Sequence, residues 1–171
     1  MAQAKIRIMA GRRAGITSLP AFTGPQETSA AFVQGAPVKI SSGDLVAVST
    51  ASAGSLLYVK KSSTANVVGF AQGTARASVT ENIVVSRIQE GAEYEGNLID
   101  VSASSAKTSK VGSTAYLAKV SADTHWGFTL NAPGASSASY VQGKVTGLID
   151  AASTVNGRVS VQLTVGGALK M

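Results

Sequence analysis

Hydrophobic and polar residues alternate in many short stretches of this chain, and one stretch shows the pattern most clearly. In residues 158–165, Val159, Val161, Leu163 and Val165 fall on one side and polar residues fall on the other. A period of two residues is the pattern of a β-strand with one buried face and one solvated face. The stretch therefore predicts a half-buried strand.

Similar runs recur from position 38 onward, roughly every ten residues, and clusters of Ser, Gly, Ala and Asn separate them. Such clusters are typical of turns, and no stretch has the pattern of a long helix. We therefore expect an all-β fold, with a compact β-barrel, β-tulip-like barrel or sandwich body of about ten short strands. The runs begin at residues 38, 45, 56, 66, 82, 94, 114, 125, 140 and 158.

The sequence pattern of a strand–turn–strand unit occurs twice in the chain. Residues 69–86 read GFAQGTARASVTENIVVS, and residues 143–160 read GKVTGLIDAASTVNGRVS. Glycines inside strand runs mark a bulge, a bend or the close approach of another backbone. We interpret the two stretches as related β-units placed alike in one body, the alternative being chance similarity in a chain of low complexity. Without a gap, the identical pairs are Gly69/Gly143, Gly73/Gly147, Ala77/Ala151, Thr80/Thr154, Asn82/Asn156, Val85/Val159 and Ser86/Ser160.

The first 37 residues have a different character. They hold Pro20, Pro25 and Pro37, and their one alternating stretch is KIRIM at residues 5–9. An isolated strand needs a sheet to join. We therefore expect an extended N-terminal arm over residues 1–37 and the β-barrel or sandwich body over residues 38–171. The alternative is that the first strand pairs with its own domain.

Basic residues concentrate in this expected arm. The chain has a formal net charge of +6, and four of its cations lie within the first thirteen positions. Such a cluster attracts an anionic surface, either nucleic acid or an acidic face of another protein. The other cations are scattered apart from Lys60 and Lys61, so nucleic acid is possible for the N-terminus only, and an anionic protein surface would serve equally well. Our overall expectation is a protein partner and no direct contact with nucleic acid. The candidate binding residues of the arm are Lys5, Ile6, Arg7, Ile8, Arg12 and Arg13.

Residues that carry catalysis or hold metals are few. The chain has no cysteine and one histidine, His125, in the stretch DTHWGFTL. These counts exclude a thiolate metal site and a site with two histidine ligands. No phosphate-binding loop or nucleophile elbow is present. We expect His125 to serve packing or the surface, and we expect no enzymatic activity, no cofactor and no metal.

Acidic residues cluster once, at Glu90, Glu93, Glu95 and Asp100. Alternation along a strand places Glu93 and Glu95 on one face and Tyr94 on the other. The spacing is not that of a calcium-binding loop. We expect a solvated edge or the acidic partner of a salt bridge between subunits.

Aromatic residues make up 5% of the chain. Because aromatic side chains are enriched at the centres of protein interfaces, four of them are candidates for a subunit interface. Ordinary core packing is the alternative for all four. They are Tyr58, Tyr94, Tyr116 and Trp126.

No apolar stretch reaches the roughly 20 residues that a membrane-spanning helix needs. The first residues also lack the apolar run of a signal peptide. We therefore expect no membrane association and synthesis in a cytoplasm.

From Phe32 to Val165 the chain resembles the capsid decoration, or cement, proteins of tailed bacteriophages. Its segments look like that family's opening module, its "vGfA" element, its G-x-x-Y step and its closing hairpin. The four segments are FVQGAPVKISSGDLVAVS at residues 32–49, LLYVKKSSTANVVGFAQGTARAS at 56–78, VGSTAYLAKVSADTHWGFTL at 111–130 and GKVTGLIDAASTVNGRVSVQLTV at 143–165.

The resemblance implies a structural virion protein with a β-barrel or β-tulip body. Members of that family sit on the outer surface of the phage head where capsomers meet, often as trimers, and stabilise the expanded capsid. Their N-terminal arms lie over neighbouring capsid proteins or add a strand to them. For this chain the resemblance implies the major capsid protein as partner, a homotrimer, and a place on the outer capsid surface. It implies no catalytic residue.

Other functions remain open on the sequence. A phage tail-tube or baseplate component would form hexameric rings. A carbohydrate-binding or adhesin-like module would need an exposed aromatic platform, such as Trp126 with a tyrosine. A hydrolase would have to use His125.

Overall fold

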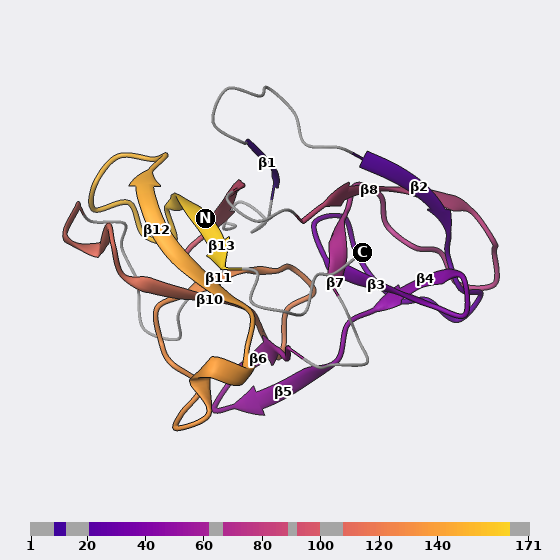
Figure 1. Ribbon diagram of the computed structural model, residues 1–171, viewed down its shortest axis with the longest axis horizontal. Helices are drawn as coiled ribbons and strands as arrows, with labels where there is room; N and C mark the ends of the chain where they lie inside the picture. Colours follow the sequence, from indigo (N-terminus) through magenta and orange to yellow (C-terminus); the bar gives the residue numbers. More distant parts are fainter. Residues whose placement is uncertain (1–8, 13–20, 62–66, 89–91, 100–107, 165–171) are drawn as a thin grey trace.

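The chain forms two antiparallel β-sheets that pack against each other. The computed structural model describes residues 9–12, 21–61, 67–88, 92–99 and 108–164, and in these ranges thirteen strands and two short 3₁₀ turns are present. Figure 1 shows the larger sheet on the left and the smaller sheet on the right. The all-β fold expected from the alternating runs is therefore confirmed.

The larger sheet has eight strands. Both of its border strands, β1 and β5, are only four residues long. The order across the sheet is β1 (Met9–Arg12), β9 (Glu93–Asn97), β13 (Arg158–Thr164), β12 (Gln142–Leu148), β10 (Thr114–Val120), β6 (Leu56–Val59) and β5 (Thr50–Ala53), with β11 (Gly127–Thr129) also paired to β10.

The smaller sheet has five strands and curls into a half-barrel. Gln26 and Leu45 form a parallel bridge, and the backbone N–H of Glu27 donates to the carbonyl of Leu45 at 3.1 Å. The first and last strands of the sheet therefore meet. The order is β2 (Ala21–Pro25), β8 (Asn82–Arg87), β7 (Val67–Ala71), β3 (Pro37–Ser41) and β4 (Asp44–Ala47); the 3₁₀ turns η1 (Thr108–Lys110) and η2 (Ser137–Ser139) lie outside both sheets.

One hydrophobic core joins the inner faces of the two sheets. Val159, Val161 and Leu163 of β13 are buried in it, as their alternation predicts, together with Phe70 and Tyr94, whose rings lie 5.1 Å apart. A smaller cluster covers the opposite face of β6 and β10 and contains Leu56, Tyr58, Ile99, Tyr116 and Ala118. Strands β6 and β10 therefore bury side chains on both faces, Val59 and Leu117 in the main core and Tyr58 and Tyr116 in the smaller cluster.

The structure corrects the boundary expected at residue 37. Strand β2 pairs with β8 from Ala21 to Pro25, and Phe32 and Ala36 are buried in the main core. Strand β1 pairs with β9, where Arg12 lies opposite Glu93. Residues 9–12 and 21–25 therefore lie in strands of the sheets, and Phe32 and Ala36 lie in the core, whereas the strand expected at residues 5–9 lies, apart from Met9, outside the described residues. Prolines and glycines interrupt the apolar residues of segment 21–37. Its sequence therefore lacks the alternation of a strand and is like that of an extended arm.

The repeated stretches form two hairpins, one in each sheet. Strands β7 and β8 are the first hairpin, and β12 and β13 are the second. A Cβ added to Gly69 would overlap the carbonyl oxygen of Ser86, and a Cβ added to Gly143 would overlap that of Gln162. Both glycines are therefore required by the same close approach of the partner strand.

The pairing in the two hairpins is offset. Gly69 lies opposite Arg87, eighteen residues later, whereas Gly143 lies opposite Leu163, twenty residues later. The second hairpin also contains a register shift between Val145 and Gly147. The two units are thus related in form, but the gap-free alignment does not extend through the second strand.

Candidate functional site

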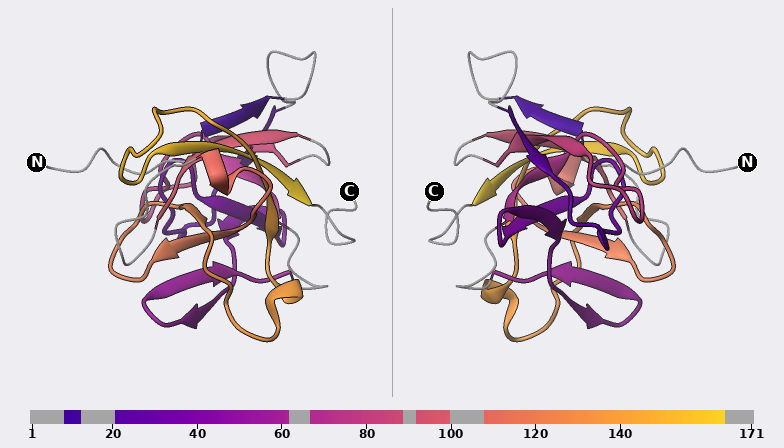
Figure 2. Two further views of the ribbon diagram at one scale, coloured as in Figure 1. Left: turned by 90° about the vertical axis from the view of Figure 1, so that its left-hand side faces the viewer. Right: turned by 90° about the vertical axis from the view of Figure 1, so that its right-hand side faces the viewer.

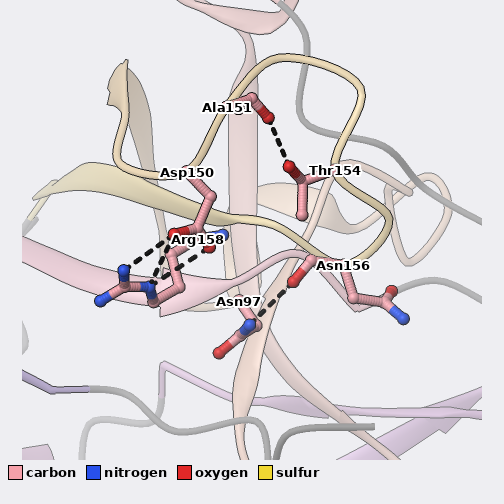
Figure 3. Close-up of polar contacts among 6 residues, drawn as sticks. All are labelled: Asn97, Asp150, Ala151, Thr154, Asn156 and Arg158. Atoms are coloured by element: carbon pink, nitrogen blue, oxygen red, sulfur yellow. Dashed lines mark hydrogen bonds and ion pairs between the residues drawn. The ribbon is translucent and has the colours of Figure 1, made fainter. Parts of the chain in front are cut away.

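The loop between β12 and β13, residues 149–157, is closed by an ion pair (Figure 3). The Nη2 of Arg158 donates to Oδ1 of Asp150 at 2.8 Å, and the backbone N–H of Arg158 donates to Oδ2 at 2.8 Å. The hydrogen bonds from the Arg158 side chain, followed by the one from its backbone, hold the pKa of Asp150 below its ordinary value. The carboxylate in turn raises the pKa of Arg158.

Two further hydrogen bonds hold the same loop. Nδ2 of Asn97, on β9, donates to the carbonyl of Asn156 at 2.7 Å, and the hydroxyl of Thr154 donates to the carbonyl of Ala151 at 2.6 Å. Asn156 adopts a left-handed backbone with φ of 50°. The loop is therefore ordered, and it presents the exposed side chains Ile149 and Val155 to solvent.

The loop of the first hairpin, residues 72–81, is tied down by a different group. Gln26 is fully buried, and its Nε2 donates to the carbonyls of Arg76 and Val79 at 2.6 and 2.9 Å. Its Oε1 accepts from the backbone N–H of Arg76 at 3.1 Å. One side chain thus satisfies three backbone groups of a loop that lies 50 residues further along the chain.

His125, the chain's one histidine, is held by its neighbour Asp123. Its Nδ1 lies 3.0 Å from Oδ1 of Asp123, which also accepts the backbone N–H groups of Thr124 and His125. Burial acts to raise the pKa of Asp123, but the hydrogen bonds from His125 and Thr124 outweigh it and the pKa lies below its ordinary value. The arrangement is that of a side-chain-capped turn, with the histidine as one of its donors.

Two grooves open at the end of the larger sheet that carries β5. The tryptophan groove has a volume of about 260 Å³, and its walls include Phe32, Thr50, Leu57, Lys119 and Trp126. The tyrosine groove has a volume of about 430 Å³, and its walls include Ala53, Leu56, Tyr58, Asn131 and Pro133. The lining of the tryptophan groove is mainly apolar with a few polar groups, whereas the lining of the tyrosine groove is slightly more polar than apolar.

The four aromatic residues named as interface candidates are buried in the single chain. Tyr94 is in the main core, and Trp126 lines the tryptophan groove with 8% of its surface exposed. Tyr58 packs edge-on against Tyr116, with ring centres 6.3 Å apart, and its hydroxyl donates to the carbonyl of Asn131 at 3.0 Å. This is the core packing named as the alternative, and their contact with a second subunit stays a prediction.

All candidate residues of the arm except Arg12 lie outside the described residues, and Arg12 is described only in its backbone. Two of the four residues of the acidic cluster, Glu90 and Asp100, also lie outside them. Glu93 and Glu95 are half-buried on one face of β9 and Tyr94 is fully buried on the other, so the predicted alternation is confirmed. Oε2 of Glu93 accepts from the hydroxyl of Ser160 at 3.1 Å. The arm residues outside the described ranges are Lys5, Ile6, Arg7, Ile8 and Arg13.

Several polar groups that hold the loops were not predicted from the sequence. The pairing of Asp150 with Arg158 and the buried Gln26 left no recognisable signal, because their partners are set by loop conformation. The spacing of Asp123 and His125, two residues apart before a strand, was a readable sign of a capped turn. Within the described ranges, no three His, Cys, Asp or Glu side chains gather as metal ligands.

Comparisons with known proteins leave the chain without an assigned relative. The chain matches no family model, and searches of curated proteins and of solved structures found no match. In the part of the chain that the structure describes, no helix is long and apolar enough to cross a membrane.

Proposed function

We propose that this chain is a structural virion protein that binds the outer surface of a phage head at capsomer junctions and stabilises the expanded capsid. The proposal assigns it the major capsid protein as partner, a homotrimeric state, no enzymatic activity and no cofactor. It rests first on the four segments that resemble the cement proteins of tailed phages.

The observation that carries the proposal is where those four segments lie in the fold. The first contains the hairpin of β3 and β4, the second contains β6 and β7, the third contains β10 and β11, and the fourth contains the hairpin of β12 and β13. The four segments that resemble the cement proteins in sequence thus coincide with strands and turns of this body. Such agreement is expected if the resemblance reflects a shared architecture.

The construction of the body supports the same proposal. No buried side-chain nitrogen or oxygen of the described residues lacks a hydrogen-bond partner. The loops of both hairpins are held by side chains distant in sequence, Gln26 directly after β2 and Asn97 on β9. A body with satisfied interior groups and fixed loops resists local opening. This is a useful property for a protein that must hold a shell under internal pressure.

Deleting residues 1–8 tests the proposal. The deletion removes Lys5 and Arg7 but leaves β1, so the body is expected to fold. Occupancy on expanded phage heads should fall at least about tenfold, because cationic contacts with an acidic shell are lost. Electron microscopy of particles assembled with each variant measures occupancy. A matched control is the double variant Lys39→Gln with Lys61→Gln, which removes two cations from the body and should bind normally.

Full occupancy of the deletion variant would contradict the role of the arm, and the absence of the intact chain from purified heads would overturn the proposal. Native mass spectrometry separates the alternatives, because a decoration protein is expected as a trimer and a tail-tube protein as a hexamer. The burial of Tyr58, Tyr94, Tyr116 and Trp126 does not favour an exposed aromatic platform of the kind a carbohydrate-binding module uses.

A further inference from the structure

Strand β5 ends the larger sheet with one edge unpaired among the described residues. It pairs with β6 from Thr50 to Ala53, and no other described strand pairs with it. Figure 1 and both views of Figure 2 place these purple strands at the lower margin of the molecule. The open edge is thus a position where a further strand can be added without moving any described strand.

The register identifies the backbone groups on that edge. The N–H of Lys60 donates to the carbonyl of Ser49, which makes these residues a hydrogen-bonded pair. Hydrogen-bonded and non-hydrogen-bonded pairs alternate along an antiparallel ladder. The pairs Thr50/Val59 and Ser52/Leu57 are therefore non-hydrogen-bonded. Consequently, the N–H and C=O groups of Thr50 and Ser52 point away from β6.

Apart from its length of only four residues, this edge lacks the features that usually prevent strand addition. Natural edge strands are commonly protected by charged side chains, proline or a bulge. Strand β5 reads Thr-Ala-Ser-Ala, without charge or proline, and its register with β6 is continuous. Its side chains are small, so another backbone can approach without obstruction.

The two grooves lie on opposite faces of the sheet at the two ends of β5. Thr50 and Leu57 line the tryptophan groove, whereas Ala53 and Leu56 line the tyrosine groove. Thr50 and Ala53 are three residues apart, so they face opposite sides of the sheet, about 10 Å apart along the strand. A strand added beside β5 would direct two side chains, also three residues apart, toward the two grooves.

Charge distinguishes the two grooves. The Nζ of Lys119, in the tryptophan groove, donates to the carbonyl of Asp123 at 3.2 Å and lies 5.8 Å from the centre of the Trp126 ring. None of the described carboxylates forms an ion pair with Lys119, and the carboxylate of Asp123 is engaged by His125. Exposed Lys60 lies near the same end of β5, but on the face of the tyrosine groove, because it follows Tyr58 by two residues. This end of the edge therefore favours an acidic side chain.

The acidic strands of a second copy are not available for this purpose. Glu93 and Glu95 lie in β9, which is paired on one side with β1 and on the other with β13. Asp44 lies in β4, which is paired with β3 and closed against Gln26 and Glu27. Among the described residues, neither of these acidic strands has a free edge, which points to a different protein as the occupant.

We propose that β5 is a docking site for an extended, acidic segment of a partner protein, which adds to the larger sheet as a further strand. A glutamate of the segment enters the tryptophan groove, where the positive charge of Lys119 attracts it, and an apolar side chain three residues away enters the tyrosine groove. Main-chain hydrogen bonds to Thr50 and Ser52 supply affinity, and the two grooves supply specificity. The inference depends on the edge and its grooves, and it holds whether or not the protein binds a phage head.

A synthetic peptide tests the site with the isolated full chain and no capsid. The probe is fluorescein-labelled Thr-Val-Glu-Thr-Val-Leu-Thr-Ser with blocked termini, and its controls carry Lys for Glu or N-methyl groups on the backbone. Fluorescence anisotropy measures binding. Hydrogen exchange at the amides of Thr50 and Ser52 should slow when the probe is bound. The N-methylated and lysine peptides should each bind at least about tenfold more weakly.

Protein variants separate the backbone contribution from that of charge. Ser52→Pro removes an outward N–H and should weaken binding about tenfold, whereas Ser52→Thr keeps the N–H and should bind normally. Lys119→Gln should abolish the preference for Glu over Lys in the peptide while leaving β5 intact. If Ser52→Pro does not fold, the N-methylated peptide tests the same hydrogen bonds.

Three results would overturn the proposal. These are no binding of the probe at millimolar concentration and low salt, equal binding of the N-methylated peptide, and protection from exchange elsewhere than β5. A chain that binds the peptide but not phage heads would disprove the proposed function alone, and the reverse result would disprove the docking site alone.

Discussion

At the scale of single residues, the ion pair of Asp150 with Arg158 is the best-defined polar contact of the described chain. The guanidinium group and the backbone N–H of Arg158 both donate to the carboxylate of Asp150. Both side chains remain partly exposed, Asp150 at 28% and Arg158 at 38%. Exposed ion pairs are weakened by solvent, so the contribution of this pair to stability is expected to be modest.

The stability contribution of Asp150 should depend on pH. The pKa of Asp150 is lower in the folded chain than its ordinary value of 3.8, so the pair stabilises the fold above that value. The contribution disappears as the pH falls through the folded pKa. Asp150→Asn should cost about 0.5–1 kcal/mol at neutral pH and nothing near pH 2, as measured by urea denaturation.

Glu81→Gln is the control for this prediction. The Arg76–Glu81 pair is 3.5 Å long, with both side chains more exposed, so its removal should have no measurable effect. An effect of Asp150→Asn that is equally large at acidic pH would show that the cost comes from the loop and not from the charge.

At the scale of elements, the two hairpins depend on glycine at one matched position. The strand that crosses Gly69 and the strand that crosses Gly143 both place a carbonyl oxygen where a Cβ would lie. Overlap with backbone is costly because a whole strand, and not only a side chain, would have to move. The matched pair Gly69 and Gly143 therefore has the same steric cause in both copies of the repeat.

Alanine substitutions test this steric requirement. Gly69→Ala and Gly143→Ala should each destabilise the fold by about 1–3 kcal/mol, because the partner strand must shift. Gly147→Ala is the matched control, since a Cβ at Gly147 meets nothing within 4 Å, and it should change stability by less than about 0.5 kcal/mol. Thermal and urea unfolding measure all three. Equal effects at Gly147 and Gly143 would contradict the explanation.

At the scale of the whole molecule, Gln26 joins three parts of the smaller sheet. Its backbone bridges to Leu45 on β4, its N–H donates to the carbonyl of Glu81, and its side chain holds the loop of the first hairpin. A buried amide with all its polar atoms bonded is stabilising only while the bonds are complete. Closure of the half-barrel thus depends strongly on one side chain.

Replacing this side chain should loosen the closed end of the sheet. Gln26→Met keeps the volume but leaves the backbone groups of Arg76 and Val79 without partners, at an expected cost of about 2–4 kcal/mol. Hydrogen exchange at the Arg76 amide should become faster than in the native chain. Gln34→Met, at an exposed position, is the control and should be neutral. Unchanged exchange at Arg76 would contradict the clamp.

Much of the fold could be predicted from the sequence, and the three strands that were not predicted share one property. Each of the ten apolar runs contains a strand, and β13 buries the face that its alternation indicated. The missed strands are β2, β5 and most of β1, and all three lie at the border of a sheet. A border strand buries less apolar surface, so small residues, glycine and proline are tolerated there and the pattern of alternation is lost.

The sequence by itself determined the class of fold and the inward face of the interior strands, because these depend on local periodicity. Only the tertiary structure decided that residues 21–27 close the half-barrel, that Gly69 and Gly143 face a carbonyl of the partner strand, that Gln26 and Asp150 find their partners, and that β5 leaves an edge between two grooves. These features arise from contacts between segments far apart in the chain, and local patterns carry no information about such distant partners.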